Sequence, residues 1–95
     1  MRLTAFEVNA IKQSAREIFG STAEVLLFGS RVDDTKKGGD IDLYITTQTG
    51  NDLAHKIKFL VSLEQKIGEQ KINVILSADK NRPIERQAIS TGVLL

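Results

Sequence analysis

Apolar residues recur at helical spacing in two long stretches of the chain, and both stretches have clear end signals. The first helix is predicted from about Thr4 to Phe19, because Thr4 and Glu7 form a capping-box pattern and Gly20 is a common helix stop. The expected buried stripe of this helix consists of Val8, Ile11, Ala15, Ile18 and Phe19. The segment is therefore an amphipathic helix that needs another element to cover its apolar side.

The second long stretch predicts a helix from about Asp52 to Ile67, which ends at Gly68. Its expected buried face consists of Leu53, Ile57, Leu60, Val61 and Ile67. A short third helix is predicted from about Ile84 to Ser90, because Pro83 precedes it at a position that tolerates proline. An apolar tail at residues 93–95 follows this helix.

Three short apolar runs between the helices predict β-strands. They cover Glu24 to Phe28, Ile41 to Thr46 and Lys71 to Leu76, and the last is rich in β-branched residues. The order helix–strand–strand–helix–strand–helix indicates an α+β fold with a small mixed sheet. We expect the helices on one face of this sheet and the polar positions of the strands on the other.

Composition narrows the range of functions. The 95 residues predict a single domain, residues 1–95, with 41% hydrophobic and 26% charged residues. The chain has no cysteine, which excludes disulfides, zinc–thiolate sites and a catalytic thiol. A net charge of +1 does not indicate nucleic-acid binding. No apolar run approaches the length of a membrane span, and residues 1–4 lack the apolar core of a signal peptide, so a cytoplasmic location is expected.

Two neighbouring polar motifs suggest the chemistry. Asp40 and Asp42 are two residues apart at the start of a strand, so their side chains point to the same face. Two adjacent carboxylates suit Mg²⁺, which prefers oxygen ligands and commonly shares them with substrate phosphates. Gly29 ends the preceding strand and permits close approach to a ligand, while Ser30 and Arg31 could face an anion. Together the motifs predict a nucleoside triphosphate site, although a lone Asp-x-Asp also fits a solvated strand face.

Gly29-Ser30-Arg31 followed by Asp40-Ile41-Asp42-Leu43 resembles the signature of the minimal nucleotidyltransferases of the DNA polymerase β superfamily. The loop at residues 32–39 has the usual length, with Gly39 where serine is common. The resemblance implies a palm-like fold and nucleotidyl transfer, with Asp40 and Asp42 as catalytic ligands of Mg²⁺ (or Mn²⁺). It also implies that residues 29–31 bind the nucleotide, ATP being the expected donor.

The family pattern has a third carboxylate on the next strand, and the matching position here is Asn73. An asparagine carbonyl can ligate a metal, but the side chain carries no charge and cannot accept a proton. General-base help is worth about 10²–10⁴ in rate, so an impaired or lost activity is one expectation. Asp79 is an alternative carboxylate, although it lies in a loop beyond the strand.

Two functions therefore remain open. One is an active enzyme that transfers AMP to a hydroxyl of a partner protein; the other is a non-catalytic subunit that acts by binding. The resemblance implies, for both, a small helical HEPN-domain partner, often an RNase toxin, that the chain would neutralise as an antitoxin. A homo-oligomer is compatible with either function, and an unrelated α+β module is the third reading.

Several other polar residues allow a functional and a structural interpretation. His55 is expected to be solvated, and Tyr44 either packs beside a nucleotide base or covers the sheet edge. Asp33 and Asp34 are interpreted as balancing the charges of Lys36 and Lys37, although the two lysines could also meet a phosphate. Arg82 and Arg86 either reach a triphosphate or the acidic surface of a partner, or are ordinary surface charges.

Overall fold

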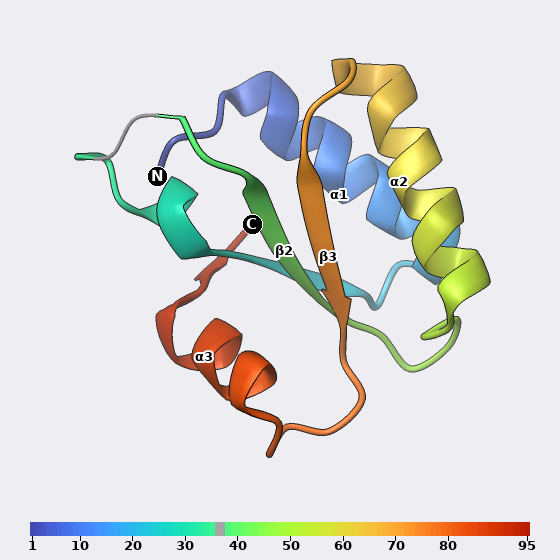
Figure 1. Cartoon of the computed structure of the whole chain (residues 1–95). Coiled ribbons are helices and arrows are strands. Elements are labelled where there is room, and N and C mark those ends of the chain that lie inside the picture. Colours follow the sequence, from blue (N-terminus) through green and yellow to red (C-terminus); the bar gives the residue numbers. More distant parts are fainter. Residues whose placement is uncertain (36–37) are drawn as a thin grey trace.

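The computed structural model describes residues 1–35 and 38–95, and its elements follow the predicted order. Within these residues the chain forms three α-helices, one 3₁₀ turn and a four-stranded mixed sheet (Figure 1). In chain order the elements are α1 (Ala5–Phe19), β1 (Glu24–Phe28), η1 (Gly29–Val32), β2 (Ile41–Thr46), α2 (Leu53–Ile67), β3 (Ile72–Leu76), α3 (Pro83–Thr91) and β4 (Val93–Leu94). The α+β prediction is confirmed. The suggested phosphate contacts of Lys36 and Lys37 lie outside the described residues.

The strand order is β3-β2-β1-β4, so β2 lies between the two other motif-bearing strands. β1 and β2 are antiparallel with Phe28 opposite Asp42, whereas β2 and β3 are parallel with Asp42 beside Asn73. This register brings the end of β1 and the starts of β2 and β3 to one end of the sheet. The short strand β4 pairs antiparallel with β1, so the apolar tail continues the sheet, which the sequence pattern did not predict.

The ends of α1 match the predicted signals. The Thr4 hydroxyl accepts a hydrogen bond from the Glu7 amide at 3.0 Å, and the Thr4 amide donates to the Glu7 carboxylate at 2.9 Å. This reciprocal capping box satisfies backbone donors that a helix start leaves without partners. Gly20 ends the helix with a φ of 98°, a conformation that glycine adopts without strain.

One face of the sheet packs against α1 and α2 and forms the larger part of the core. The side chains of Leu27, Leu43 and Ile45 are fully buried there, together with Phe59 and Leu63 from α2. Clustering of this many apolar side chains between two helices and a sheet supplies the main stabilisation of the fold.

The predicted buried face of α2 was wrong in part. Leu53, Ile57 and Val61 are 69%, 51% and 51% exposed, whereas Phe59 and Leu63 are fully buried. The reason is that α2 carries apolar residues around most of its circumference, so its contacts with α1 decide its rotation. The Phe19 and Phe59 rings pack with centroids 5.9 Å apart, and further along Lys66 donates to Ser14, Glu17 and Ser62.

The third helix lies on the opposite face of the sheet from α1 and α2, which corrects the expectation that all helices share one face (Figure 1). Ala88 of α3 packs on Phe28 and Tyr44 in a second cluster. Because β1 and β2 place these two large side chains on the same face as Asp42, part of that face must be covered. The carboxylates therefore have α3 as a neighbour.

In the part of the chain that the structure describes, no helix has the length and apolar character needed to cross a bilayer.

Candidate active site

The structure brings together the three polar residues predicted to do the chemistry. The Asn73 side-chain amide donates to Asp40 Oδ2 at 3.1 Å and to Asp42 Oδ1 at 2.9 Å. Asp40 lies just before β2, Asp42 is its second residue, and Asn73 occupies the matching position of β3. The amide must present its NH₂ group here, because ionised carboxylates only accept hydrogen bonds.

Gly29 lies directly against this carboxylate pair. It adopts a φ of 77°, and a Cβ atom at this position would be 2.2 Å from Asp42 Oδ2. Any side chain would therefore collide with the carboxylate as well as strain the backbone. Within the chain the group that approaches Gly29 closely is Asp42, and the close approach of a ligand to Gly29 stays a prediction.

The two halves of the motif also touch at Ser30 and Gly39. Gly39 has a φ of 91°, and a Cβ atom there would lie 2.3 Å from the Ser30 Oγ atom. The serine that is common at this position in similar sequences would not fit without a shift of Ser30. The absence of a side chain at Gly39 therefore lets the backbone there approach the Ser30 hydroxyl.

Arg31 is engaged with the chain itself. Its Nε donates to the Gly39 carbonyl at 3.1 Å and its Nη1 donates to the Arg2 carbonyl at 3.0 Å. Arg2 in turn donates from Nη2 to the Ser30 carbonyl at 2.9 Å and from its amide to the Arg31 carbonyl at 2.7 Å. These bonds fix the N-terminal segment beside η1, and the role of Arg31 toward an anion stays a prediction.

Lys71 is a neighbour that the sequence reasoning missed. Its ammonium lies 3.7 Å from Asp40 Oδ2, and its side chain is 79% exposed. The signal was present in the sequence, because Lys71 precedes Asn73 by two residues and so shares its side of an extended segment. A positive charge therefore stands beside the carboxylate pair.

The side chains of the site that could ligate a metal suit a hard divalent cation, but they are few. Asp40 and Asp42 supply carboxylate oxygens, and Asn73 can turn its carbonyl toward a metal. No group of three or more His, Cys, Asp or Glu side chains in residues 1–35 and 38–95 is placed to hold a metal ion. Two carboxylates with shared phosphates fit Mg²⁺, which rarely uses an all-protein cage.

A hollow of about 430 Å³ opens beside Gly29 and Ser30. Val32 and Asp33 line its other side within the motif loop, and α3 contributes Gln87 and Thr91, which the sequence pattern did not indicate. Its volume lies within the range of about 300–1,000 Å³ typical of small-molecule sites. No sequence signal could identify the α3 residues, because their position depends on α3 packing across the carboxylate face.

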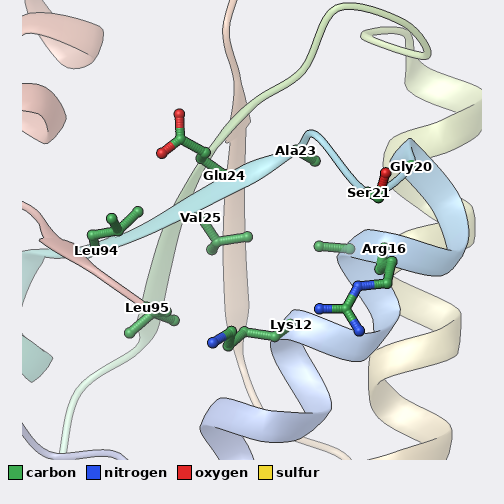
Figure 2. A pocket seen from close by; sticks show the side chains of 10 residues that line it. Lys12, Arg16, Gly20, Ser21, Ala23, Glu24, Val25, Leu94 and Leu95 are labelled. Atoms are coloured by element: carbon green, nitrogen blue, oxygen red, sulfur yellow. The ribbon is translucent and has the colours of Figure 1, made fainter.

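A smaller hollow of about 160 Å³ lies at the opposite end of β1 (Figure 2). Lys12 and Arg16 of α1 face a gap bounded by Val25 and Leu95. It is below the usual size of small-molecule sites, and its lining has one carboxylate, Glu24, in place of a carboxylate pair. The chemistry is therefore assigned to the site around Asp42.

Tyr44 has a structural role. It is 1% exposed beneath α3, and its hydroxyl donates to Glu85 at 2.8 Å. Burial and the neighbouring Glu85 carboxylate raise the pKa of Tyr44 to about 12. Tyr44 therefore packs neither beside a nucleotide base nor over the sheet edge, since β2 is an inner strand.

Of the remaining candidates, His55 and Arg82 make contacts within the chain, and Asp79 lies away from the carboxylate pair. His55 Nδ1 lies 2.7 Å from Asp52 Oδ1, which also accepts from the His55 amide and caps α2. Arg82 donates to Glu85. Asp79 lies three residues beyond the far end of β3, and the strand from Asn73 to Leu76 alone spans about 10 Å, so Asp79 cannot serve as the third carboxylate.

The family model described as "Polymerase beta, Nucleotidyltransferase" matches residues 9–95, a segment that contains every predicted site residue. No curated protein matched the chain.

Proposed function

The chain belongs to the polymerase β nucleotidyltransferase family, and from that premise we propose that it binds a nucleoside triphosphate with Mg²⁺ (or Mn²⁺) and transfers AMP from ATP to a hydroxyl of a partner protein. The observation that carries the proposal is the placement of Asp42 against Gly29, with Asp40 held beside Asp42 through the Asn73 amide and a hollow lined by Gly29 and Ser30.

In this reaction the acceptor hydroxyl oxygen bonds to the α-phosphorus, the bond to the bridging oxygen breaks, and pyrophosphate leaves. Asp40 and Asp42 would hold Mg²⁺, which when bound stabilises negative charge on the attacking and leaving oxygens. The Gly29 amide and the Ser30 hydroxyl would receive the β- and γ-phosphates, because glycine leaves the backbone accessible there. The acceptor proton passes to solvent, since Asn73 cannot take it.

Replacement of Asp42 by alanine tests the binding half of this proposal. We expect affinity for ATP with Mg²⁺ to fall by about 100-fold or more, because even supporting residues around a metal ligand are worth about 10–100-fold. Calorimetric titration of ATP in excess Mg²⁺ measures the change. Glu69→Ala, which removes an exposed carboxylate after α2, is the matched control and should bind like the wild type. Equal affinity in the wild type and Asp42→Ala would contradict the proposal.

A second function is favoured by Asn73 itself. A neutral side chain at this position removes the proton acceptor, and the amide holds both carboxylates by hydrogen bonds. A domain that binds but barely transfers would act as an antitoxin by complex formation with a helical HEPN-type partner. An exposed apolar stripe on α2 supports a protein partner. It consists of Leu53, Ile57 and Val61, which follow one another at four-residue spacing, the pattern by which helices engage apolar surfaces.

Co-expression with a helical HEPN protein encoded by an adjacent gene tests this second function. We expect the two proteins to co-elute from a size-exclusion column at micromolar concentration. Ile57→Glu should weaken the complex about 10-fold or more, because it places a charge in the centre of the apolar stripe. Lys58→Glu, one residue along and exposed, is the control. Separate elution would count against this partner, and a dimer of the chain alone would identify a second copy as the occupant.

A further inference from the structure

The oxygens of the two carboxylates face different neighbours. On the β3 side, Asp40 Oδ2 and Asp42 Oδ1 both accept from the Asn73 amide, at 3.1 and 2.9 Å. Lys71 adds its ammonium 3.7 Å from the same Asp40 oxygen. On the other side, Asp42 Oδ2 is the atom that lies against Gly29. Donor hydrogens therefore fill the β3 side, while the remaining oxygen of Asp42 lies on the Gly29 side, and Gly29 itself lines the hollow.

The charges around Asp40 and Asp42 also distinguish the β3 side of the site from the Gly29 side. Asp40 and Asp42 bring two negative charges, Lys71 brings one positive charge, and Asn73 is neutral. Two divalent ions about 3.5–4 Å apart repel each other strongly and depend on surrounding carboxylates for compensation. Here a second ion would meet an ammonium and an amide NH₂ where a further carboxylate would be needed.

We propose that Asn73 and Lys71 take the place of a second metal ion, so that the site binds one divalent cation together with the nucleotide. This inference rests on the proposed function, because it concerns the metal content of the same site. Asp42 is the principal ligand of the single ion on the Gly29 side. Asn73 and Lys71 are positioning residues that hold Asp40 and Asp42 together without a second cation.

Counting bound Mn²⁺ in the presence of α,β-methylene ATP, which cannot transfer its nucleotide, tests the proposal. Equilibrium dialysis against the same concentration of analogue gives the excess Mn²⁺ carried by the protein, and electron paramagnetic resonance separates an isolated ion from a coupled pair. The wild type should carry one Mn²⁺ per protein, without coupling. The double variant Asn73→Asp/Lys71→Met should carry two, with the spectrum of a coupled pair. Lys12→Met, which removes a lysine at the far end of the sheet, should carry one.

The outcomes separate the two proposals. Two coupled ions in the wild type would overturn the single-ion inference while supporting nucleotide binding. A single ion in both the wild type and the double variant would also overturn it, because Asn73 and Lys71 would then not be what excludes the second ion. If the wild type binds no Mn²⁺ with the analogue, the proposed function itself fails. Circular dichroism of each variant confirms that the fold is retained before binding is compared.

Discussion

Replacement of Asn73 by aspartate is expected to raise the rate of nucleotidyl transfer by about 10²–10⁴-fold, the usual worth of a positioned proton acceptor. The new carboxylate would lie where the Asn73 amide now lies, between Asp40 and Asp42. There it could take the proton of the attacking hydroxyl and add the charge that a second ion requires. The side chains are nearly the same size, and position 73 is exposed, so packing should barely change.

The same substitution should destabilise the protein slightly when no metal is present. Two hydrogen bonds from the Asn73 amide are lost, and a third negative charge is placed beside Asp40 and Asp42. Because the site is solvated, the repulsion is of the order of 1 kcal/mol per pair. Addition of Mg²⁺ should restore the free energy of unfolding, which denaturant titration with and without Mg²⁺ measures.

Transfer of labelled AMP from ATP to the partner protein, in excess Mg²⁺, measures the rate. Asn73→Ala is the matched control, because it removes the amide without supplying a carboxylate, and it should show no gain. Asp42→Ala combined with Asn73→Asp should also show none, since the metal ligand is gone. If the wild type already transfers rapidly and Asn73→Asp does not improve it, position 73 is not the vacant acceptor position. The assignment of the third strand's role would then be wrong.

Local sequence rules were sufficient for the three helices, for β1 to β3 and for bringing Asp40, Asp42 and Asn73 together. The Thr4–Glu7 capping box and the stop at Gly20 define α1 through bonds between neighbouring residues, so the sequence predicts them well. Asp40 and Asp42 share a face because side chains alternate along an extended chain. The alternation of Asn73 between apolar neighbours placed it correctly once β3 paired in parallel with β2.

The incorrect predictions all depend on how elements pack against one another. The buried side of α2 follows from its contacts with α1, as the Phe19–Phe59 packing shows, and not from its own apolar pattern. The position of α3 across the carboxylate face depends on the cluster around Tyr44. Pairing of Val93 with Leu27 makes a strand of a tail too short to carry any periodic signal.

The least predictable residue is Glu85, which reads as an ordinary surface acid in the first turn of α3. It is fully buried, and its carboxylate accepts hydrogen bonds from the Asp79 amide at 2.8 Å, the Ala78 amide at 3.1 Å and the Tyr44 hydroxyl at 2.8 Å. Arg82 donates to it at 3.4 Å. Glu85 thus ties the loop after β3 and the inner strand β2 to the helix that walls the hollow.

The surroundings of Glu85 also set its ionisation. Burial would raise the pKa of Glu85, but hydrogen bonds from the Asp79 and Ala78 amides and from Tyr44, with the Arg82 charge, together hold it below its usual value of 4.5. A carboxyl whose pKa is lowered on folding stabilises the protein above its unfolded pKa and loses that contribution as pH falls through its folded pKa. The contribution of Glu85 should therefore be complete at neutral pH and decline only below about pH 4.5.

Replacement of Glu85 by alanine is expected to lower the free energy of unfolding by about 3–5 kcal/mol, because the Tyr44 hydroxyl and the Ala78 and Asp79 amides lose their acceptor and each buried polar group left unpaired costs about 1–3 kcal/mol. Urea titration at neutral pH measures the loss. Glu85→Gln retains a carbonyl acceptor and should lose clearly less, whereas the exposed Glu69→Ala should stay within about 0.5 kcal/mol of the wild type.

The pH dependence of the free energy of unfolding shows whether the stabilisation comes from the negative charge of Glu85. As the pH falls below 4.5 and then through the lower folded pKa of Glu85, the wild type should approach Glu85→Gln in stability, because the carboxyl is protonated first in the unfolded chain and finally in the folded chain. Since Gln87 and Thr91 extend from the same helix to the hollow beside Gly29, Glu85→Ala should also weaken nucleotide binding under conditions where it remains folded. If Glu85→Ala unfolds at the same urea concentration as the wild type, the buried carboxylate does not hold α3 on the sheet, and the wall of the hollow must be fixed by the apolar contacts of Ile84 and Ala88.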